Sequence, residues 1–196
     1  MISREEAIKL IEKKVTNKNI IKHMFALEAL MGAIWEELKK KGKTEEELSG
    51  TKEEWMMVGL LHDGDYCEEV PEEKQGIQIS EWVKDEGFEI PESVSYAMAS
   101  HNYKTGIKPK NLMDWSVFIG DSLTGLIVAS TLVLPNKKLS DLTTRSVLKK
   151  FKSSSFAKST RRQDIVLCKD KLGFSLEEFI EICLKSMQGI SSDLGL

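Results

Sequence analysis

The chain of 196 residues has few cysteines, and their arrangement marks neither a disulfide framework nor a thiolate metal site. Its three cysteines, Cys67, Cys168 and Cys183, lie far apart without a Cys-x-x-Cys spacing, so we expect reduced thiols in a cytoplasmic protein. The segment from Met1 to Lys14 alternates charged and apolar residues, so it lacks the apolar stretch of a signal peptide. Alternation with a period of two residues is also missing, which disfavours β-strands.

An excess of charge of one sign is absent as well. Lysine and arginine number 28 and aspartate and glutamate number 31, which gives a formal net charge of -3. Without a general basic face, bulk binding of nucleic acid is disfavoured. One basic stretch invites a phosphate-binding interpretation, but charge runs are usually solvated faces, and we favour the solvated face. This stretch contains Lys149, Lys150, Lys152, Lys158, Arg161 and Arg162.

The longest apolar run, Trp115–Leu134, is long enough on paper to cross a bilayer. It contains several hydroxyl residues and Asp121, and an aspartate in mid-span costs about 2.5–3.5 kcal/mol on insertion scales. We therefore predict a buried core helix and no membrane association. No lysine or arginine lies between Lys110 and Lys137, so the partner of the buried Asp121 carboxylate must come from elsewhere in the fold. A metal ion would serve, and the alternatives are a distant arginine or the end of another helix.

Helical periodicity runs through nearly the whole chain, with no internal repeat, low-complexity segment or linker. We therefore predict one all-α domain over residues 1–196, with a core at about 17–135 and C-terminal helices at about 136–190 packed on it. Capping boxes at Ser3, Thr51 and Ser175, together with Asn17 and the prolines, mark helix starts. The eight or nine expected helices cover about 3–15, 17–40, 51–64, 71–87, 91–102, 110–134, 139–150, 161–172 and 175–188, with polar loops at about 43–50 and 103–108.

Histidine is scarce, and its three positions, His23, His62 and His101, all lie in or at the end of an expected apolar helix. His62 and Asp63 directly follow the apolar run Trp55–Leu61, where the negative end of the helix dipole favours a cation. Each histidine also has a plainer interpretation. His62 can simply cap the end of its helix beside a solvated Asp63. His23 and His101 can be core histidines whose hydrogen bonds are made within the protein.

Four residues from three separate helices, His23, His62 with Asp63, and Asp121, offer two imidazoles and two carboxylates. We predict that they bind one divalent metal ion. A mixed set of nitrogen and oxygen ligands suits Mn, Fe, Co, Ni or Zn, with Mg possible at higher concentration.

This order of His, His-Asp and Asp resembles the signature of the HD superfamily of metal-dependent phosphohydrolases. The apolar lead-in Met57–Leu61 is similar to the one before the family's His-Asp doublet. Asp65 and Tyr66 give the pattern His-Asp-x-Asp-Tyr, which resembles a small bacterial and archaeal branch, as do the segments 97–102 and 120–125. The resemblance covers most of the chain. It implies an HD-domain helical bundle and hydrolysis of phosphate esters.

Two positions depart from the pattern of that family. Members with two metals carry an additional histidine where this chain has Gln75, whereas their next histidine is matched by His101. We therefore expect one ion rather than two. The family's single-metal nucleotidases often place a glutamate three residues after the aspartate of the doublet, where this chain has Tyr66.

Residues around the expected ion receive candidate roles. Asp65 is the predicted acid or base for the leaving group, and His101 is the predicted contact to substrate phosphate or to water. Lys104 is the predicted phosphate-binding cation. Thr124, one helical turn after the last ligand, and Gln75 are expected beside the ligands. The alternatives are a solvated acid, a core histidine and a solvated lysine.

Three functions remain open from the sequence. The leading hypothesis is a metal-dependent phosphohydrolase, similar to a phosphomonoesterase or nucleotidase, that cleaves a phosphate ester of a small metabolite or nucleotide. The second is a regulatory HD domain that binds metal and ligand without turnover, which Gln75 and Tyr66 favour. The third is a metal-free helical interaction module. A small phosphorylated molecule is the expected partner, and monomer and homodimer are both compatible with the sequence.

Overall fold

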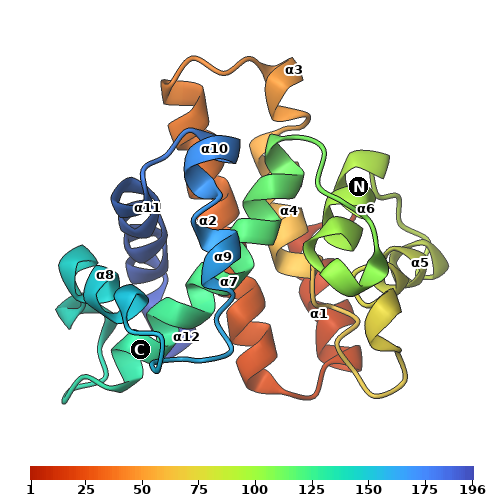
Figure 1. Ribbon diagram of the computed structural model, residues 1–196. Helices are drawn as coiled ribbons and strands as arrows, with labels where there is room; N and C mark the ends of the chain where they lie inside the picture. Colours follow the sequence, from red (N-terminus) through yellow and green to blue (C-terminus); the bar gives the residue numbers. More distant parts are fainter.

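The computed structural model describes all 196 residues, and every regular element in it is helical (Figure 1). In chain order the α-helices are α1 (Arg4–Lys14), α2 (Lys18–Lys40), α3 (Glu45–Leu48), α4 (Lys52–Leu61), α5 (Gln78–Asp85), α6 (Glu92–His101), α7 (Leu112–Leu132), α8 (Thr144–Lys152), α9 (Arg162–Ile165), α10 (Cys168–Leu172), α11 (Leu176–Gly189) and α12 (Ser191–Leu194). Three short 3-10 helices are η1 (Glu72–Lys74), η2 (Tyr103–Thr105) and η3 (Leu139–Asp141). The predicted all-α class is confirmed.

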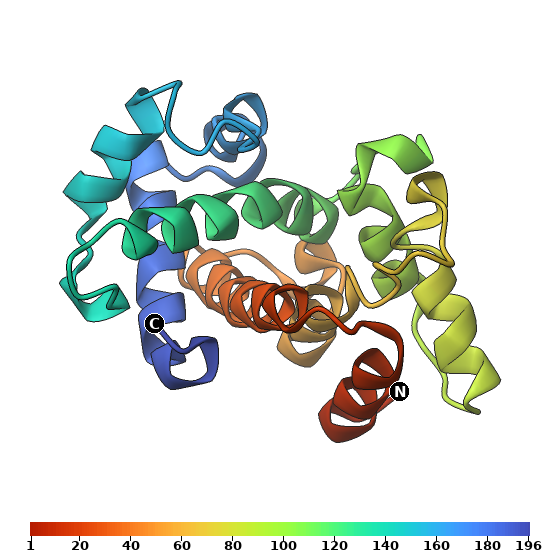
Figure 2. The ribbon, with the colours of Figure 1, turned by 90° about the horizontal axis from the view of Figure 1, so that it is seen from below.

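Helices α2, α4 and α7 form the centre of the molecule, and the other helices cover them. Helices α5 and α6 lie on one side of this centre and α8 to α11 on the other, as two perpendicular views agree (Figures 1 and 2). Helix α2 packs against α4, α7 and α11, while α7 packs against α6 and against the C-terminal helices. The whole chain therefore shares one core, which contains 42 buried hydrophobic residues.

The helix starts follow the capping signals. Ser3, Thr51 and Ser175 each form the predicted capping box, and the Asn17 side chain caps α2. A fourth capping box at Thr44 starts α3 inside the segment expected to be a polar loop. The prediction of a loop there was wrong, although Thr44 with Glu47 carries the same signal as the other three boxes.

Two predicted helices are interrupted in the structure. The segment 71–87 divides into η1 and α5, because Gly76 adopts a φ of +89° and leaves helical geometry. The segment 161–172 divides into the short helices α9 and α10. In the segment 139–150, a turn of 3-10 helix comes first, and α8 begins only where the Thr143 side chain accepts the backbone N–H of Ser146.

Helix α7 is the one helix long and apolar enough to cross a membrane by length and composition. In the fold it is the central helix, with 56% of its most apolar window buried. The structure therefore agrees with the prediction of a core helix for this apolar run.

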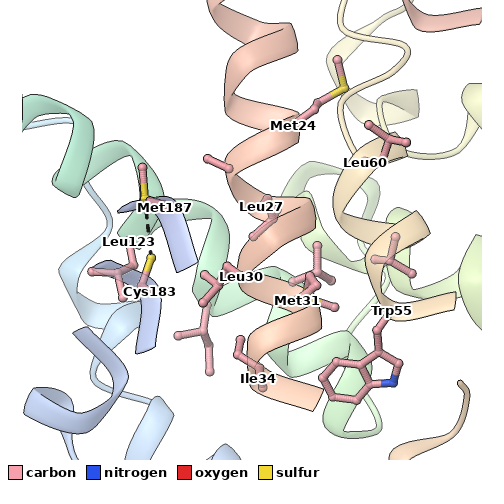
Figure 3. Packing of buried hydrophobic residues seen from close by; sticks show 14 of the residues in the cluster. Met24, Leu27, Leu30, Met31, Ile34, Trp55, Leu60, Leu123, Cys183 and Met187 are labelled. Carbon is pink, nitrogen blue, oxygen red and sulfur yellow. Dashed lines mark hydrogen bonds between the residues drawn. The ribbon is translucent and has the colours of Figure 1, made fainter. Parts of the chain in front are cut away.

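The core at the centre of the bundle is built on the face of α2 that carries Leu27, Leu30 and Ile34 (Figure 3). Gly59 of α4 lies directly on the backbone of α2, because a Cβ atom there would stand 2.6 Å from the Leu27 carbonyl oxygen. Gly120 of α7 approaches the same turn, where a Cβ atom would meet the Leu30 side chain at 2.9 Å. These two glycines let α4 and α7 approach α2 more closely than any larger residue allows.

We expect Gly59→Ala to destabilise the protein by about 1–3 kcal/mol or more, because the new methyl group meets backbone that cannot rotate away. Denaturant unfolding followed by circular dichroism measures this change. The matched control is Gly125→Ala in α7, where no atom lies within 4 Å of the new Cβ. That control should be neutral or stabilising by up to about 1 kcal/mol. Equal stability of the two variants would contradict the close approach of α4 to α2.

Candidate metal centre

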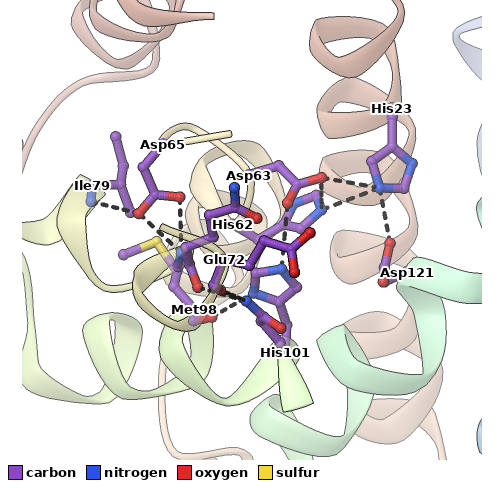
Figure 4. Close-up of polar contacts among 12 residues, drawn as sticks. His23, His62, Asp63, Asp65, Glu72, Ile79, Met98, His101 and Asp121 are labelled. Atoms are coloured by element: carbon purple, nitrogen blue, oxygen red, sulfur yellow. Dashed lines mark hydrogen bonds and ion pairs between the residues drawn. The ribbon is translucent and has the colours of Figure 1, made fainter. Parts of the chain in front are cut away.

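The four predicted metal ligands come from three central helices and meet at one place (Figure 4). His23 Nε2 of α2 lies 2.9 Å from Asp121 Oδ1 of α7 and 3.2 Å from His62 Nε2 at the end of α4. Asp63 Oδ2 lies 3.4 Å from His62 Nε2 and 3.7 Å from His23 Nε2. The ligand atoms of His23, His62 and Asp63 all lie within 4.8 Å of one another, and Asp121 joins this group through His23.

These separations fit a set of ligands around one ion. Two atoms that each lie about 2.1 Å from a metal are about 3.0 Å apart at a right angle and about 3.4 Å apart at the tetrahedral angle. The distances among His23, His62 and Asp63 range from 3.2 to 3.7 Å, and Asp121 lies 2.9 Å from His23, outside this three-residue group. His23, His62 and Asp63 therefore fit a divalent cation, with Asp121 next to them through His23.

Hydrogen bonds fix which nitrogen of each ring faces the group. The Nδ1 atom of His62 lies 2.8 Å from the Gly59 carbonyl oxygen, which can only accept, so Nδ1 carries the proton. Thr124 donates its hydroxyl proton to the Asp121 carbonyl oxygen, so it accepts from Nδ1–H of His23 at 3.2 Å. In the neutral rings of both histidines, Nε2 is left as a lone-pair acceptor that points at another acceptor.

The two carboxylates respond electrostatically to the surrounding imidazoles. Burial raises the pKa of Asp63, but His62 and His101 outweigh burial and hold it well below its ordinary value. Burial likewise raises the pKa of Asp121, and its contact with His23 reverses that effect and lowers the pKa. For His23, burial lowers the pKa, whereas Asp121 and Asp63 raise it above the ordinary value. Both carboxylates therefore stay ionised beside the imidazoles.

His101, the last residue of α6, lies on the other side of Asp63. Its Nδ1 donates to the Met98 carbonyl oxygen at 2.5 Å, and its Nε2 lies 3.4 Å from Asp63 Oδ1. Burial lowers the pKa of this imidazole, but the contact with Asp63 dominates and raises the pKa to about 9. His101 is therefore buried beside the four-residue group, as predicted, and it holds a proton near neutral pH.

A cavity of about 240 Å³ opens beside these residues. Five predicted site residues line it, namely Asp63, Gln75, His101, Lys104 and Asp121, together with Tyr66, Glu72, Asn102 and Arg161. A larger cavity of about 720 Å³ shares Tyr66, Glu72 and Gln75 with it and extends toward the end of α1. Two of the four candidate ligands, Asp63 and Asp121, are therefore reachable from this cavity.

Lys104 and Gln75 lie at the cavity, each with a partner from the protein. The Lys104 ammonium group forms an ion pair with Glu72, which joins η2 to η1. The Gln75 side chain donates weakly to the Val70 carbonyl oxygen at 3.4 Å, and it lines both cavities. The structure thus brings both residues to the predicted place.

Asp65 is not brought to the cavity. Its side chain is fully buried, and its two oxygens accept the backbone N–H groups of Gly76 and Ile79 at 2.8–2.9 Å. Burial raises the pKa of this carboxyl group, but both oxygens are occupied in capping α5 (Figure 4). The prediction that Asp65 acts on the leaving group was wrong, and so was the alternative of a solvated loop acid. The carboxylate is buried because it accepts backbone N–H groups at the start of α5.

Arg161 lines the cavity. The prediction that the whole basic stretch from Lys149 to Arg162 is a solvated face was therefore wrong for this residue. Lys149, Lys152 and Lys158 of the same basic stretch are exposed, as expected, whereas Arg161 and Arg162 are partly buried. The Arg161 guanidinium carbon lies 4.8 Å from the centre of the Tyr103 ring and 4.9 Å from that of Phe118. No signal in the sequence separates Arg161 from the lysines around it, because its aromatic neighbours are distant along the chain.

Comparisons of the chain with protein-family models, with curated proteins and with solved structures find no match.

We expect Thr124→Val to weaken binding of Mn²⁺ by about 10–100-fold, because the isosteric side chain cannot hold Nδ1–H of His23 and fix its ring. Calorimetric titration with Mn²⁺ measures the affinity. Thr131→Val is the matched control, because Thr131 is a buried threonine of the same helix that bonds only to the Ile127 carbonyl oxygen. If both variants bind Mn²⁺ alike, the ring of His23 is not held through Thr124.

Protons should compete with the metal for the imidazoles. Because Asp121 and Asp63 raise the pKa of His23, its proton persists at a pH where a free histidine is neutral. A metal has to displace that proton, so affinity falls as pH falls and rises as pH increases through the raised pKa. We expect the Kd for Mn²⁺ to be at least about tenfold larger at about pH 6 than at about pH 8. A Kd that stays constant between these values would show that no histidine binds the ion.

Proposed function

We propose that the protein is a metal-dependent phosphohydrolase that cleaves a phosphate ester of a small metabolite or nucleotide. The observation that carries this proposal is the convergence of His23, His62, Asp63 and Asp121 beside a small cavity that also contains cationic side chains. Without an ion, a proton on His23 holds its imidazole against Asp121 and Asp63, and a divalent cation can take the place of that proton. Lysine and arginine at the same cavity favour an anionic substrate over a neutral one.

In the proposed reaction, one set of residues would hold the metal ion and a second set orients those ligands. A divalent ion, when bound, supplies positive charge against phosphate oxygens and lowers the pKa of the attacking water. His23, His62, Asp63 and Asp121 would hold that ion. Thr124 and the Gly59 carbonyl group orient the two rings through their Nδ1–H groups, so the ligands keep their positions during reaction.

Proton transfer to the leaving group falls to His101 in this proposal. Its imidazole lines the cavity, its Nδ1 is held by the Met98 carbonyl oxygen, and its Nε2 lies 3.4 Å from Asp63 Oδ1. A leaving oxygen that receives this proton departs as a neutral alcohol. Asp65 takes no part, because its oxygens are bonded to the backbone.

The second candidate function is a regulatory domain that binds metal and ligand without turnover. Two observations favour it. Gln75 and Tyr66 line the cavity at the two positions where the resemblance to the HD superfamily implies metal-binding or acidic residues. In this case, the same four ligands hold the ion and no residue needs to move a proton.

We expect protein incubated with Mn²⁺ to retain about one ion per chain and to release 4-nitrophenol from 4-nitrophenyl phosphate. Asp63→Asn should lose most of the metal and the activity. His101→Gln should keep the metal and lower kcat by about 10²–10⁴-fold, because the leaving group loses its proton donor. Elemental analysis and a spectrophotometric assay measure the two properties.

The control is Asp85→Asn, which removes an exposed carboxylate far from the group of ligands and should change neither property. Equal phosphate release by the wild type and by Asp63→Asn rules out the hydrolase. Metal retention without turnover of aryl phosphates or of a nucleotide panel supports the regulatory domain. Less than a few tenths of an ion per chain supports the metal-free interaction module.

A further inference from the structure

Arg161 is the one residue at the cavity that combines fixed geometry with an unused hydrogen-bond donor. We propose that it binds the phosphate group of the substrate and that the site selects phosphate monoesters. This inference rests on the proposed function, since it concerns the substrate of the same cavity. Arg161 stands just before α9, far in sequence from the metal ligands, and reaches the cavity that Asp63 and Asp121 line.

The guanidinium group of Arg161 is held in place from three sides. Its Nε donates to Asp164 in the following turn. The rings of Tyr103 and Phe118 lie within 5 Å of its carbon, at 4.8 and 4.9 Å. Phe118 precedes Asp121 by one turn of α7, and Tyr103 follows His101 by two residues. The aromatic contacts therefore hold the guanidinium between the segment that carries His101 and the helix that carries Asp121.

One terminal nitrogen of Arg161 has no partner. Its Nη2 is buried and donates to no acceptor in the protein. An unsatisfied buried donor on a charged group is costly, and proteins usually keep such groups paired. The other terminal nitrogen, Nη1, also donates to no acceptor in the protein and is not buried, so an anion in the cavity can bond to it, and the fork of an arginine matches two oxygens of a phosphate.

Arg162 keeps the segment before Arg161 ordered. Its guanidinium donates to five backbone carbonyl groups between residues 150 and 157, including Phe151 at 2.8 Å and Phe156 at 2.5 Å. The two adjacent arginines thus have different roles. Arg162 binds the backbone of its own loop, and Arg161 is presented to the cavity with little conformational freedom left to lose.

Lys104 makes a weaker candidate for the same role. It already forms an ion pair with Glu72, and 38% of its side chain is exposed, against 23% for Arg161. Both cations pair with one carboxylate, but only Arg161 has a buried nitrogen without an acceptor and a planar fork that matches phosphate oxygens. Arg161 is therefore the principal phosphate contact of the protein and Lys104 an auxiliary one.

The selection of monoesters follows from the number of phosphate oxygens. A monoester has three non-bridging oxygens, enough for the fork of Arg161 and for an ion that His23, His62, Asp63 and Asp121 would hold. A diester has two such oxygens and carries a second substituent that also has to fit in a cavity of about 240 Å³. The adjoining cavity of about 720 Å³ has room for the single leaving group of a monoester.

The test measures binding of inorganic phosphate to Mn²⁺-loaded protein by calorimetry, after metal content has been determined for each variant. We expect Arg161→Met to retain the metal and to raise the Kd for phosphate by about 10–100-fold. Arg161→Lys should fall between this variant and the wild type, because the charge remains and the fork is lost. Lys158→Met, an exposed cation of the same loop, should stay within about twofold of the wild type.

Each outcome decides between the two proposals. A Kd for Arg161→Met within twofold of the wild type, or no phosphate binding by the wild type, overturns the role of Arg161. If Arg161→Met fails to fold, as judged by circular dichroism, Arg161→Lys and Arg161→Gln replace it under the same criterion. A wild type that binds phosphate through Arg161 but hydrolyses no aryl phosphate overturns only the proposed hydrolase.

Substrate class is tested with a matched pair of aryl esters. The wild type should hydrolyse 4-nitrophenyl phosphate at least about 100-fold faster than bis(4-nitrophenyl) phosphate, with Arg161→Met losing most of this preference. Equal rates for the two esters overturn the selection of monoesters.

Discussion

The arrangement of the whole site depends on how closely α4 and α7 approach α2. Gly59 and Gly120 both contact the turn of α2 that begins at Leu27, one helical turn after His23. His62 follows the first glycine by three residues, and Asp121 follows the second directly. Any larger residue at either glycine moves a helix outward by the size of a methyl group or more, and the ligand it carries moves with it. The packing of the core and the spacing of the ligands are therefore set by the same contacts.

The three imidazoles share one arrangement. Each ring donates its Nδ1–H group to the protein around the site and points its Nε2 atom toward the carboxylates of the site. The Nδ1–H groups of His62 and His101 bond to carbonyl oxygens of their own helices, and that of His23 bonds to Thr124. Asp65, by contrast, accepts the backbone N–H groups of Gly76 and Ile79 with its two carboxylate oxygens. It therefore connects the segment that carries His62 and Asp63 to the start of α5. Burial of so many acceptors is tolerable only when a cation balances them.

Sequence patterns predicted the helix starts and the grouped ligands. A Ser or Thr with a glutamate three residues later is a local signal for a helix start, whereas the four candidate ligands were grouped by their order along the chain and its resemblance to the HD signature. Asp65 and Arg161 could not be placed in this way. The role of Asp65 depends on Gly76 and Ile79 across a turn, and that of Arg161 on Tyr103 and Phe118, which only the tertiary fold brings near.

The ion pair between Lys104 and Glu72 lines the cavity and is more exposed than the candidate ligands. Salt screens exposed charges over a distance of about 8 Å at physiological ionic strength, and it screens buried groups much less. Added salt therefore loosens this outer pair more than it weakens the contacts among His23, His62 and Asp63. The side chains at the surface of the cavity and those at its inner wall consequently respond differently to the ionic strength of the surroundings.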